Sequence, residues 1–434
     1  MKEKQLAQDL LDFIDNSPSP YHAVKSIENQ LADYDFEQLD EKHKWKLNPG
    51  GRYYIVRDDS SIIFFIAGTK PLTDSGYKIF GAHTDSPGLK IKPTPVNNAD
   101  GLIRLGVEIY GGPILATFTD RDLSLAGRIS YKTSTGKISS KLIHFDQPLL
   151  RLPNLAIHMN RTVNEDGLKL HKQNELALII SNSLETQLPQ QYLAQLLEKT
   201  SSVKADQILS WELNVYDTQK GSFWGDEQQF YANSQLDNLA SCHIGVQALL
   251  NDSALKSGNT ILCAFFDHEE IGSESTKGAD GSFLPDILER IALAMDLNKE
   301  DYQRTLANSF MISADMAHAY QPNFPAAYEP DHKVTVNKGP VIKVNANHRY
   351  SSECISEAMF ILWCEQTNTP YQKYSHRTDI PCGSTIGPMT SAKLGIRTVD
   401  VGNPMWAMHS IRESAGVKDH TYMINVINCF FSTE

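Results

Sequence analysis

The sequence predicts an α/β protein with a mixed, mainly parallel sheet flanked by helices and interrupted by a β-rich insert. Apolar runs bounded by turn residues alternate with helix-like segments at both ends of the chain, which is typical of parallel sheets. Between them lie short β-like runs separated by Gly, Pro and Asn. The 434 residues are also too many for one ordinary domain. We expect a discontinuous α/β domain over residues 1–90 and 233–434 and a β-rich domain over residues 91–232.

The N-terminal segment predicts two helices and then strands. Apolar residues within 3–16 fall on one helical face. The two prolines of residues 17–20 end that helix, and a second helix begins near Tyr21. The apolar runs at 53–67 and 77–82 predict strands, and the second leads directly into a polar stretch that begins with histidine.

The middle and C-terminal parts of the chain differ in the pattern of their apolar and turn residues. Runs at 105–110, 125–132 and 137–145 predict the short strands of the insert. From about residue 233 the α/β pattern returns, beginning with a helix at 237–250. The further elements expected there are strands at 260–266, 309–314, 340–345 and 396–401, and helices near 284–296 and 353–366.

Composition excludes several classes of function. A net charge of −12 without a basic stripe argues against nucleic acid and against an anionic membrane surface as partners. No run approaches the roughly 20 apolar residues of a membrane span, and the N-terminus lacks the apolar core of a signal peptide. The six cysteines form no Cys-x-x-Cys pair, which favours free thiols in a reducing compartment. We therefore expect a cytoplasmic protein.

Ionisable residues gather where predicted strands end or helices begin. The apolar run 259–266 leads into Asp267-His268-Glu269-Glu270, and chemistry in open α/β sheets lies beyond the carboxyl ends of strands. Each of these residues alone reads more simply as a turn residue or helix cap. The positions that stand out are His83, Asp85, Asp237, Glu269, Glu270, Asp315 and His409.

Imidazoles and carboxylates without thiolates suit Zn²⁺, with Mn²⁺ or Co²⁺ possible. Two histidines and three carboxylates are too many ligands for one catalytic zinc but fit two ions, and Asp237 is the candidate that bridges them. Glu269 would then be the general base, taking a proton from water and passing it to the leaving amine. Asp85 would accept the second N–H of His83 and orient that ring.

Ten stretches, in order along nearly the whole chain, resemble the M18 aminopeptidases, the aspartyl aminopeptidase family of the zinc exopeptidase clan. They carry all seven residues named above. The matching stretches are residues 17–22, 81–87, 120–123, 155–158, 235–239, 267–273, 313–319, 339–345, 381–388 and 407–413.

The resemblance implies an aminopeptidase that hydrolyses single N-terminal residues from peptides with two metal ions. His83 and Asp315 would hold one ion, Glu270 and His409 the other, with Asp237 between them. It also implies that the insert mediates dimerisation, or acts as a lid, and that dimers build a tetrahedral homododecamer. His158 matches a family histidine that reaches a neighbouring subunit's active site.

Many family members prefer N-terminal Asp or Glu, which requires a cation in the pocket. Lys343 is the first candidate and Arg349 the second, and the simpler interpretation of Lys343 is a surface residue. Other members prefer neutral or basic residues, and residues 347–350 and 376–379 depart from the family pattern. Two rival classes stay open: another dimetal amidohydrolase, such as a carboxypeptidase or deacylase, and a non-catalytic assembly protein.

Overall fold

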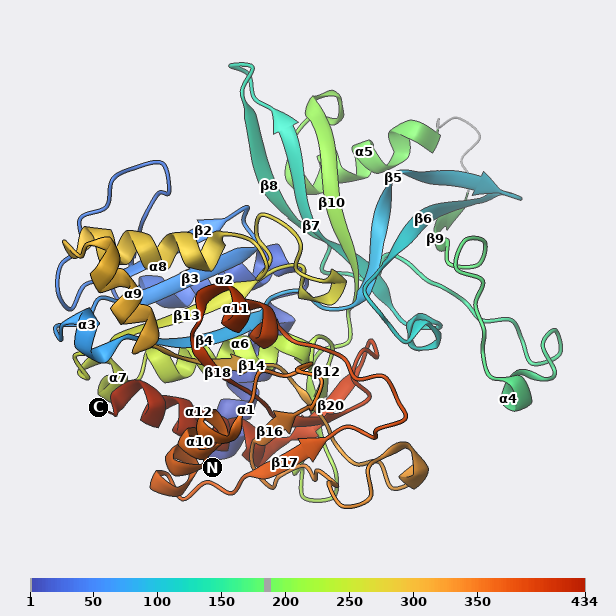
Figure 1. Ribbon diagram of the computed structural model, residues 1–434. Coiled ribbons are helices and arrows are strands. Elements are labelled where there is room, and N and C mark those ends of the chain that lie inside the picture. Colours follow the sequence, from blue (N-terminus) through green and yellow to red (C-terminus); the bar gives the residue numbers. More distant parts are fainter. Residues whose placement is uncertain (1, 183–188, 434) are drawn as a thin grey trace.

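The computed structural model describes residues 2–182 and 189–433, and a nine-stranded mixed sheet forms its centre (Figure 1). The strand order across the sheet is β1-β2-β3-β13-β4-β14-β18-β16-β17. The bounds are β1 (Glu37–Gln38), β2 (Arg52–Arg57), β3 (Ser61–Ile66), β4 (Tyr77–His83), β13 (Thr260–Phe266), β14 (Phe310–Ala314), β16 (Val341–Val344), β17 (Gln372–Ser375) and β18 (Arg397–Gly402).

Four adjacent central strands run in one direction. β4 pairs in parallel with β13 on one side and with β14 on the other, and β14 pairs in parallel with β18. The carboxyl ends of these strands therefore meet at one edge of the sheet. The expected mixed, mainly parallel α/β fold is confirmed.

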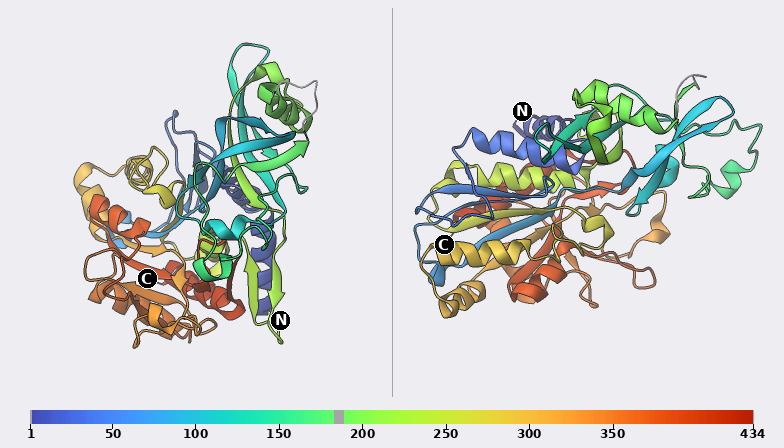
Figure 2. Two further views of the ribbon diagram at one scale, coloured as in Figure 1. Left: turned by 90° about the vertical axis from the view of Figure 1, so that its right-hand side faces the viewer. Right: turned by 90° about the horizontal axis from the view of Figure 1, so that it is seen from above.

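Helices cover both faces of this sheet because side chains alternate between the faces along each strand (Figure 2). Every residue of β13 is buried: Cys263 and Phe265 contribute to one core, and Leu262, Ala264 and Phe266 to the other. The first core packs against α1 (Lys2–Asp15), α2 (Pro20–Ala32), α6 (Leu236–Leu249), α10 (Cys354–Gln366) and α12 (Val417–Ser432). The second packs against α8 (Phe283–Ala294), α9 (Lys299–Ala307) and α11 (Ile386–Leu394).

A separate, wholly antiparallel sheet of six strands stands beside the central one (Figure 1). Its order is β8-β7-β10-β5-β6-β9, and α5 (Pro189–Ser201) buries Leu193 and Leu197 in its core. The strands are β5 (Gly88–Ala99), β6 (Leu102–Tyr110), β7 (Leu123–Lys132), β8 (Ile138–His144), β9 (Leu178–Asn182) and β10 (Ile208–Asp217).

A third sheet joins the end of the predicted insert to the C-terminal part, in the order β11-β12-β20-β19-β15. These strands are β11 (Ser222–Trp224), β12 (Phe230–Asn233), β15 (Ala317–His318), β19 (Pro404–Trp406) and β20 (Glu413–Gly416). The short helices are α3 (Leu72–Ser75), α4 (Val163–Asp166) and α7 (Asp252–Leu255), with 3₁₀ turns at Leu115–Phe118, Ala205–Gln207, Glu269–Ile271 and Pro325–Ala327. The division into two domains at residues 90 and 233 stays a prediction.

Two expectations need correction. The run 53–67 is not one strand but the β2–β3 hairpin, because Asp58 and Asp59 adopt positive φ angles of 51° and 60°, as a tight hairpin turn requires. The C-terminal helix α12 was not anticipated, although its unburied residues recur at helical spacing, at Lys418, Tyr422, Asn425, Asn428, Cys429 and Ser432.

Two further features bear on the sequence-based expectations. Within residues 2–182 and 189–433, we find no helix with the length and apolarity needed to cross a membrane. All six cysteines are free thiols, and Cys242, Cys263 and Cys364 are buried.

Two histidines form a buried pair between α6 and α12. His243 Nδ1 lies 2.9 Å from His420 Nε2, and the rings stack with centroids 5.0 Å apart. Burial lowers the pKa of His243 to about 3, and burial together with His243 lowers the pKa of His420 well below its usual value. Both imidazoles are therefore neutral in the folded protein at neutral pH.

This pair predicts a loss of stability in mild acid. The unfolded chain binds a proton at each imidazole below pH about 6.5, whereas folded His243 resists protonation down to pH about 3. The contribution is complete above pH 6.5 and falls as the pH drops, by about 2 kcal/mol for His243 at pH 5. Urea unfolding of metal-free protein at pH 7 and pH 5 measures this loss of stability. His243→Gln should reduce the pH dependence, and the same change at the exposed His348 should not.

Candidate metal centre

The first group of possible ligands surrounds His83, the last residue of β4, which is 1% exposed. Its Nε2 lies 3.5 Å from Oδ1 of Asp237 and 3.5 Å from Oδ1 of Asp315. Asp237 is in the first turn of α6, and Asp315 directly follows β14, the neighbour of β4. The parallel pairing of β4 with β14 therefore brings together residues more than 230 positions apart.

The second group surrounds His409, in the loop after β19. Its Nε2 lies 3.5 Å from Oδ2 of Asp237 and 3.5 Å from Oε2 of Glu270. Each oxygen of Asp237 thus faces a different imidazole, and Oδ1 has no hydrogen-bond partner among the described residues. Asp237 does not act as a simple helix cap; it lies between two histidines.

The outer nitrogens of both rings fix which atoms can bind a cation. His83 Nδ1 lies 3.0 Å from the main-chain oxygen of Asp85 and 3.3 Å from its Oδ1, and His409 Nδ1 lies 3.1 Å from the main-chain oxygen of Gly112. All these partners only accept hydrogen bonds, so each Nδ1 carries the hydrogen. Each Nε2 then faces the carboxylates and is the ring atom that can bind a cation once it has lost its proton, as in metal-binding histidines.

The spacing of these atoms fits a metal ion. Bonds of about 2.0–2.2 Å from a tetrahedral zinc to nitrogen or oxygen separate the ligand atoms by about 3.3–3.6 Å. The four imidazole–carboxylate separations of 3.5 Å match that value and exceed the 2.7–3.2 Å of a hydrogen bond. One ligand atom each from His83, Asp237 and Glu270 also lies within 4.8 Å of the others.

Electrostatics also favour a cation here. Burial raises the pKa of Glu270 well above its usual value, and the charge of Asp237 raises it further. Burial disfavours protonated imidazoles, yet Glu269 and the other carboxylates raise the pKa of His83 well above its usual value, and Asp237 raises that of His409 to about 9. The closely spaced carboxylates thus repel one another unless positive charge lies between them, and a divalent ion would supply that charge.

Glu269 faces the same space from the turn after β13. Its Oε2 lies 4.0 Å from His83 Nε2, and its side chain is 14% exposed. Burial, reinforced by neighbouring carboxylates, raises its pKa to about 8. The preceding residue, His268, has a φ of 68°, and such left-handed residues often occur at functional sites.

Asp85 organises this turn as well as His83. Its Oδ1 accepts the backbone N–H of Glu269 and its Oδ2 that of Glu270, both at 3.1 Å. The carboxylate is fully buried. One side chain therefore holds the orientation of an imidazole and of the two adjacent glutamates.

Sequence reasoning missed two residues of this centre. Buried Glu413 accepts the backbone N–H of Asp237 at 3.0 Å and that of His409 at 2.7 Å. Tyr110, at the end of β6, donates from its hydroxyl to Oδ2 of Asp85 at 2.6 Å. Glu413 ends a stretch that matched the family, and this offered a signal. Tyr110 belongs to a different sheet, and nothing in its local sequence indicates its target.

The residues expected to bind substrate have different surroundings. Lys343, on β16, is 2% exposed, and its Nζ lies 3.2 Å from Oδ2 of Asp315 and 3.2 Å from the main-chain oxygen of Met316. It is therefore no surface residue. Arg349 is exposed, and its Nε donates to the main-chain oxygen of Gly383 at 3.4 Å.

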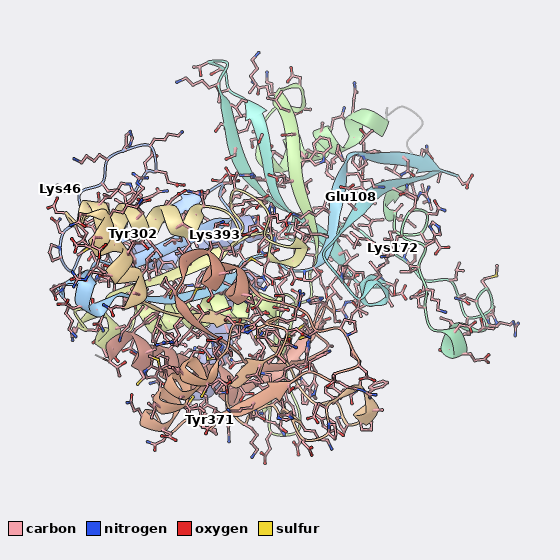
Figure 3. The ribbon with its side chains drawn as sticks, in the orientation of Figure 1. Lys46, Glu108, Lys172, Tyr302, Tyr371 and Lys393 are labelled. Carbon is pink, nitrogen blue, oxygen red and sulfur yellow. The ribbon has the colours of Figure 1, made fainter. Side chains whose placement is uncertain are left out.

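His158 is exposed and lies in the long connection from β8 to β9. This connection, which includes α4 and Lys172, reaches away from the body of the molecule (Figures 1 and 3). The structure thus brings His83, Asp85, Asp237, Glu269, Glu270, Asp315 and His409 together, with Lys343 beside Asp315. Arg349 and His158 have no contact with this group among the interactions of the described residues.

Imidazoles and carboxylates grouped at the carboxyl edge of a mainly parallel sheet define a metallohydrolase. Comparison with known proteins narrows the class. Residues 13–431 match the family described as Aminopeptidase I zinc metalloprotease (M18). A probable M18 family aminopeptidase 2 of Ectopseudomonas mendocina (strain ymp) is 44% identical over 432 residues, which is 99% of both chains.

Solved structures of similar proteins agree with this family assignment. A cryo-EM structure of the Ape4 and Nbr1 complex aligns with a TM-score of 0.95 at 38% identity, over 99% of this chain and 86% of that chain. The S. cerevisiae mApe1 dodecamer aligns with a TM-score of 0.86 at 27% identity, over 99% and 97% of the two chains. The chain belongs to the M18 family and is a metalloaminopeptidase, which confirms the resemblance seen in its motifs.

The position of Asp237 predicts a specific metal-binding defect. Asp237→Ala should remove a ligand from both histidine groups and weaken Zn²⁺ binding by at least 100-fold, whereas His409→Ala should impair one group and leave the other. Titration of metal-free protein with Zn²⁺ in competition with a coloured chelator measures the number of Zn²⁺ ions bound and the affinity of the protein for them. A wild-type stoichiometry and affinity in Asp237→Ala would contradict a shared ligand.

Proposed function

We propose that this protein uses two divalent ions, most favourably Zn²⁺ with Mn²⁺ or Co²⁺ as alternatives, to hydrolyse single N-terminal residues from peptides. The observation that carries the proposal is Asp237, whose two oxygens each lie 3.5 Å from a different imidazole Nε2. In this proposal His83 and Asp315 complete one ion's ligands, and His409 and Glu270 complete the other's. Three protein groups per ion leave positions for water and substrate.

The chemistry divides between the ions and the chain. When bound, the ions would polarise the scissile carbonyl and acidify water. Glu269 acts as general base: its carboxylate accepts a proton from the attacking water and returns it to the amine that leaves. Asp85 contributes by holding His83 and the backbone of Glu269 in place. Burial and the neighbouring carboxylates raise the pKa of Glu269 to about 8 in the metal-free protein, and bound cations would lower it and favour the carboxylate form that accepts a proton.

The proposed substrate preference is for N-terminal Asp or Glu. Lys343 supports it, because an ammonium group has three donors and two of them face Asp315 and Met316. The Nζ also lies 5.1 Å from the centroid of the Tyr350 ring, and in this proposal the third donor pairs with a substrate carboxylate. Arg349 is the second candidate, at the surface. A pocket next to His409, lined by His318, Tyr328, Met405 and Trp406 among others, would admit the peptide.

The proposed assembly is a homododecamer built from dimers through the insert. A solved relative is described as a dodecamer. In this chain, the segment around His158 exposes Leu155, Ile157 and Met159 by 68%, 47% and 75% of their surface. Contiguous exposed apolar side chains are typical of protein contacts, and His158 would then reach a neighbouring subunit's active site. The unpaired cysteines support a cytoplasmic location.

Replacing the base tests the proposed reaction. Glu269→Gln keeps the shape of the side chain but cannot accept a proton, so we expect kcat to fall by at least 10³-fold while Zn²⁺ binding persists. Hydrolysis of Asp and Glu anilides with a free N-terminus measures the rate, with chelator and with added Zn²⁺, Mn²⁺ or Co²⁺. Substrates blocked at either end distinguish an aminopeptidase from a carboxypeptidase or deacylase. Wild-type turnover by Glu269→Gln would refute this mechanism.

Replacing the buried lysine tests the proposed specificity. Lys343→Met should reduce kcat/KM for Asp and Glu anilides by about 10–100-fold, because losing a charge-assisted hydrogen bond costs about 1.5–3 kcal/mol. The Leu anilide should be affected much less. Arg349→Met tests the second candidate in the same assay. An equal loss of kcat/KM for Asp and Leu substrates would mean that Lys343 only holds Asp315 in position. If the wild-type protein prefers Leu or Lys substrates, the proposed pocket for acidic residues is refuted.

A further inference from the structure

One short segment of the antiparallel sheet's domain reaches the metal centre. The strand β6 ends at Tyr110, and residues 111–112 continue from it toward the proposed metal ligands. The exposed Glu108, near this end of the strand, is labelled in Figure 3. Most ligands lie on the central sheet or its loops, so residues 110–112 approach them from a different part of the fold. We call residues 110–112 the β6 tip.

The first contact is made by Tyr110. Its side chain is 8% exposed, and its hydroxyl donates to Oδ2 of Asp85 at 2.6 Å. The same Oδ2 accepts the backbone N–H of Glu270, and the other oxygen accepts that of Glu269. Lys90, with its Nζ 3.8 Å from the ring centroid, packs on the Tyr110 ring and helps to hold it. Tyr110 therefore contributes to the hydrogen bonding that orients His83 and both glutamates.

The second contact depends on the absence of a side chain. Gly111 has a φ of +66°, and a Cβ there would lie 3.1 Å from the Cβ of Glu270 and 3.1 Å from its main-chain oxygen. Such distances are shorter than ordinary van der Waals contact. Glycine thus allows the β6 tip to lie directly against a proposed ligand.

The third contact reaches the other histidine. The main-chain oxygen of Gly112 lies 3.1 Å from Nδ1 of His409, and Ile114 N donates to the main-chain oxygen of His409 at 2.9 Å. The β6 tip therefore supports His83 through Asp85 and supports His409 directly. These two imidazoles belong to the two proposed ion sites.

We propose that the β6 tip is a positioning element of the metal centre, through which the antiparallel domain sets the orientation of both metal-binding imidazoles. Tyr110 is its main positioning residue, and Gly111 permits its close approach. The inference rests on the metal centre proposed above. It assigns the insert a part in metal binding within its own subunit, independent of any role in assembly.

Metal affinity is the property that should change. Removing the outer hydrogen-bond partners of metal ligands typically lowers metal affinity or activity 10–100-fold. Tyr110→Phe removes only the hydroxyl and keeps the ring on Lys90. We expect about 10–100-fold weaker Zn²⁺ binding, a lower kcat and a KM within about twofold. Gly111→Ala should weaken Zn²⁺ binding at the Glu270 side.

Matched controls separate positioning from general destabilisation. Tyr216→Phe removes another hydroxyl of the same sheet, which donates to the main-chain oxygen of Phe145 at 2.6 Å. Gly101→Ala places alanine at the opposite end of β6, where φ is +85° and a Cβ would contact nothing within 4 Å. Both controls should bind Zn²⁺ as wild type does. Melting of the metal-free proteins reports folding separately.

Competition between each metal-free protein and a coloured chelator for Zn²⁺ is the decisive experiment. Weaker binding by Tyr110→Phe and Gly111→Ala, at melting temperatures no lower than those of their controls, supports the proposal. Wild-type affinity in Tyr110→Phe overturns it and leaves the proposed function standing. Equal weakening in test and control variants also overturns it, because the effect is then general. If wild-type protein binds no Zn²⁺, the metal centre itself is refuted, and this inference with it.

Discussion

Buried carboxylates must be compensated by positive charge, and this constraint governs the arrangement of side chains at the carboxyl edge of the central sheet. Asp237 lies between two imidazoles, Glu269 and Asp315 face that of His83, and Glu270 faces that of His409. None of these four side chains is more than 15% exposed. Water cannot screen such charges, so the protein must supply cations or protons. Lys343 provides one cation at Asp315. The raised pKa values of Glu270, His83 and His409 reflect the negative charge that Lys343 does not neutralise.

The fold meets this constraint by bringing distant segments to one place. Parallel pairing of β13, β4, β14 and β18 puts their carboxyl ends at a single edge. Outer hydrogen bonds then fix the side chains: Asp85 holds His83 and the glutamate turn, and Glu413 holds the backbones of Asp237 and His409. The β6 tip adds contacts from the second sheet. Geometry at the centre thus depends on elements from almost the whole chain.

The sequence predicted the parts of this structure that follow from local pattern. Apolar runs located the central strands, and polar residues directly after them located His83, Glu269 and Asp315, because a strand end determines where the next side chain lies. His409 also stood out, in the loop after the predicted strand 396–401, and the resemblance to a family assigned it to one ion with Glu270. Tyr110 and Gly112 could not be predicted, because their contacts depend on how two sheets pack. The β2–β3 hairpin was missed because its turn, at Asp58 and Asp59, contains no glycine.

We infer that two metal ions share the carboxylate of Asp237. Anomalous diffraction from zinc-loaded crystals, measured at the zinc absorption edge, tests it most directly. We expect two peaks about 3.5–4 Å apart, one next to His83 and Asp315 and the other next to His409 and Glu270, with Asp237 between them. A single peak, or two peaks that do not both contact Asp237, would contradict it.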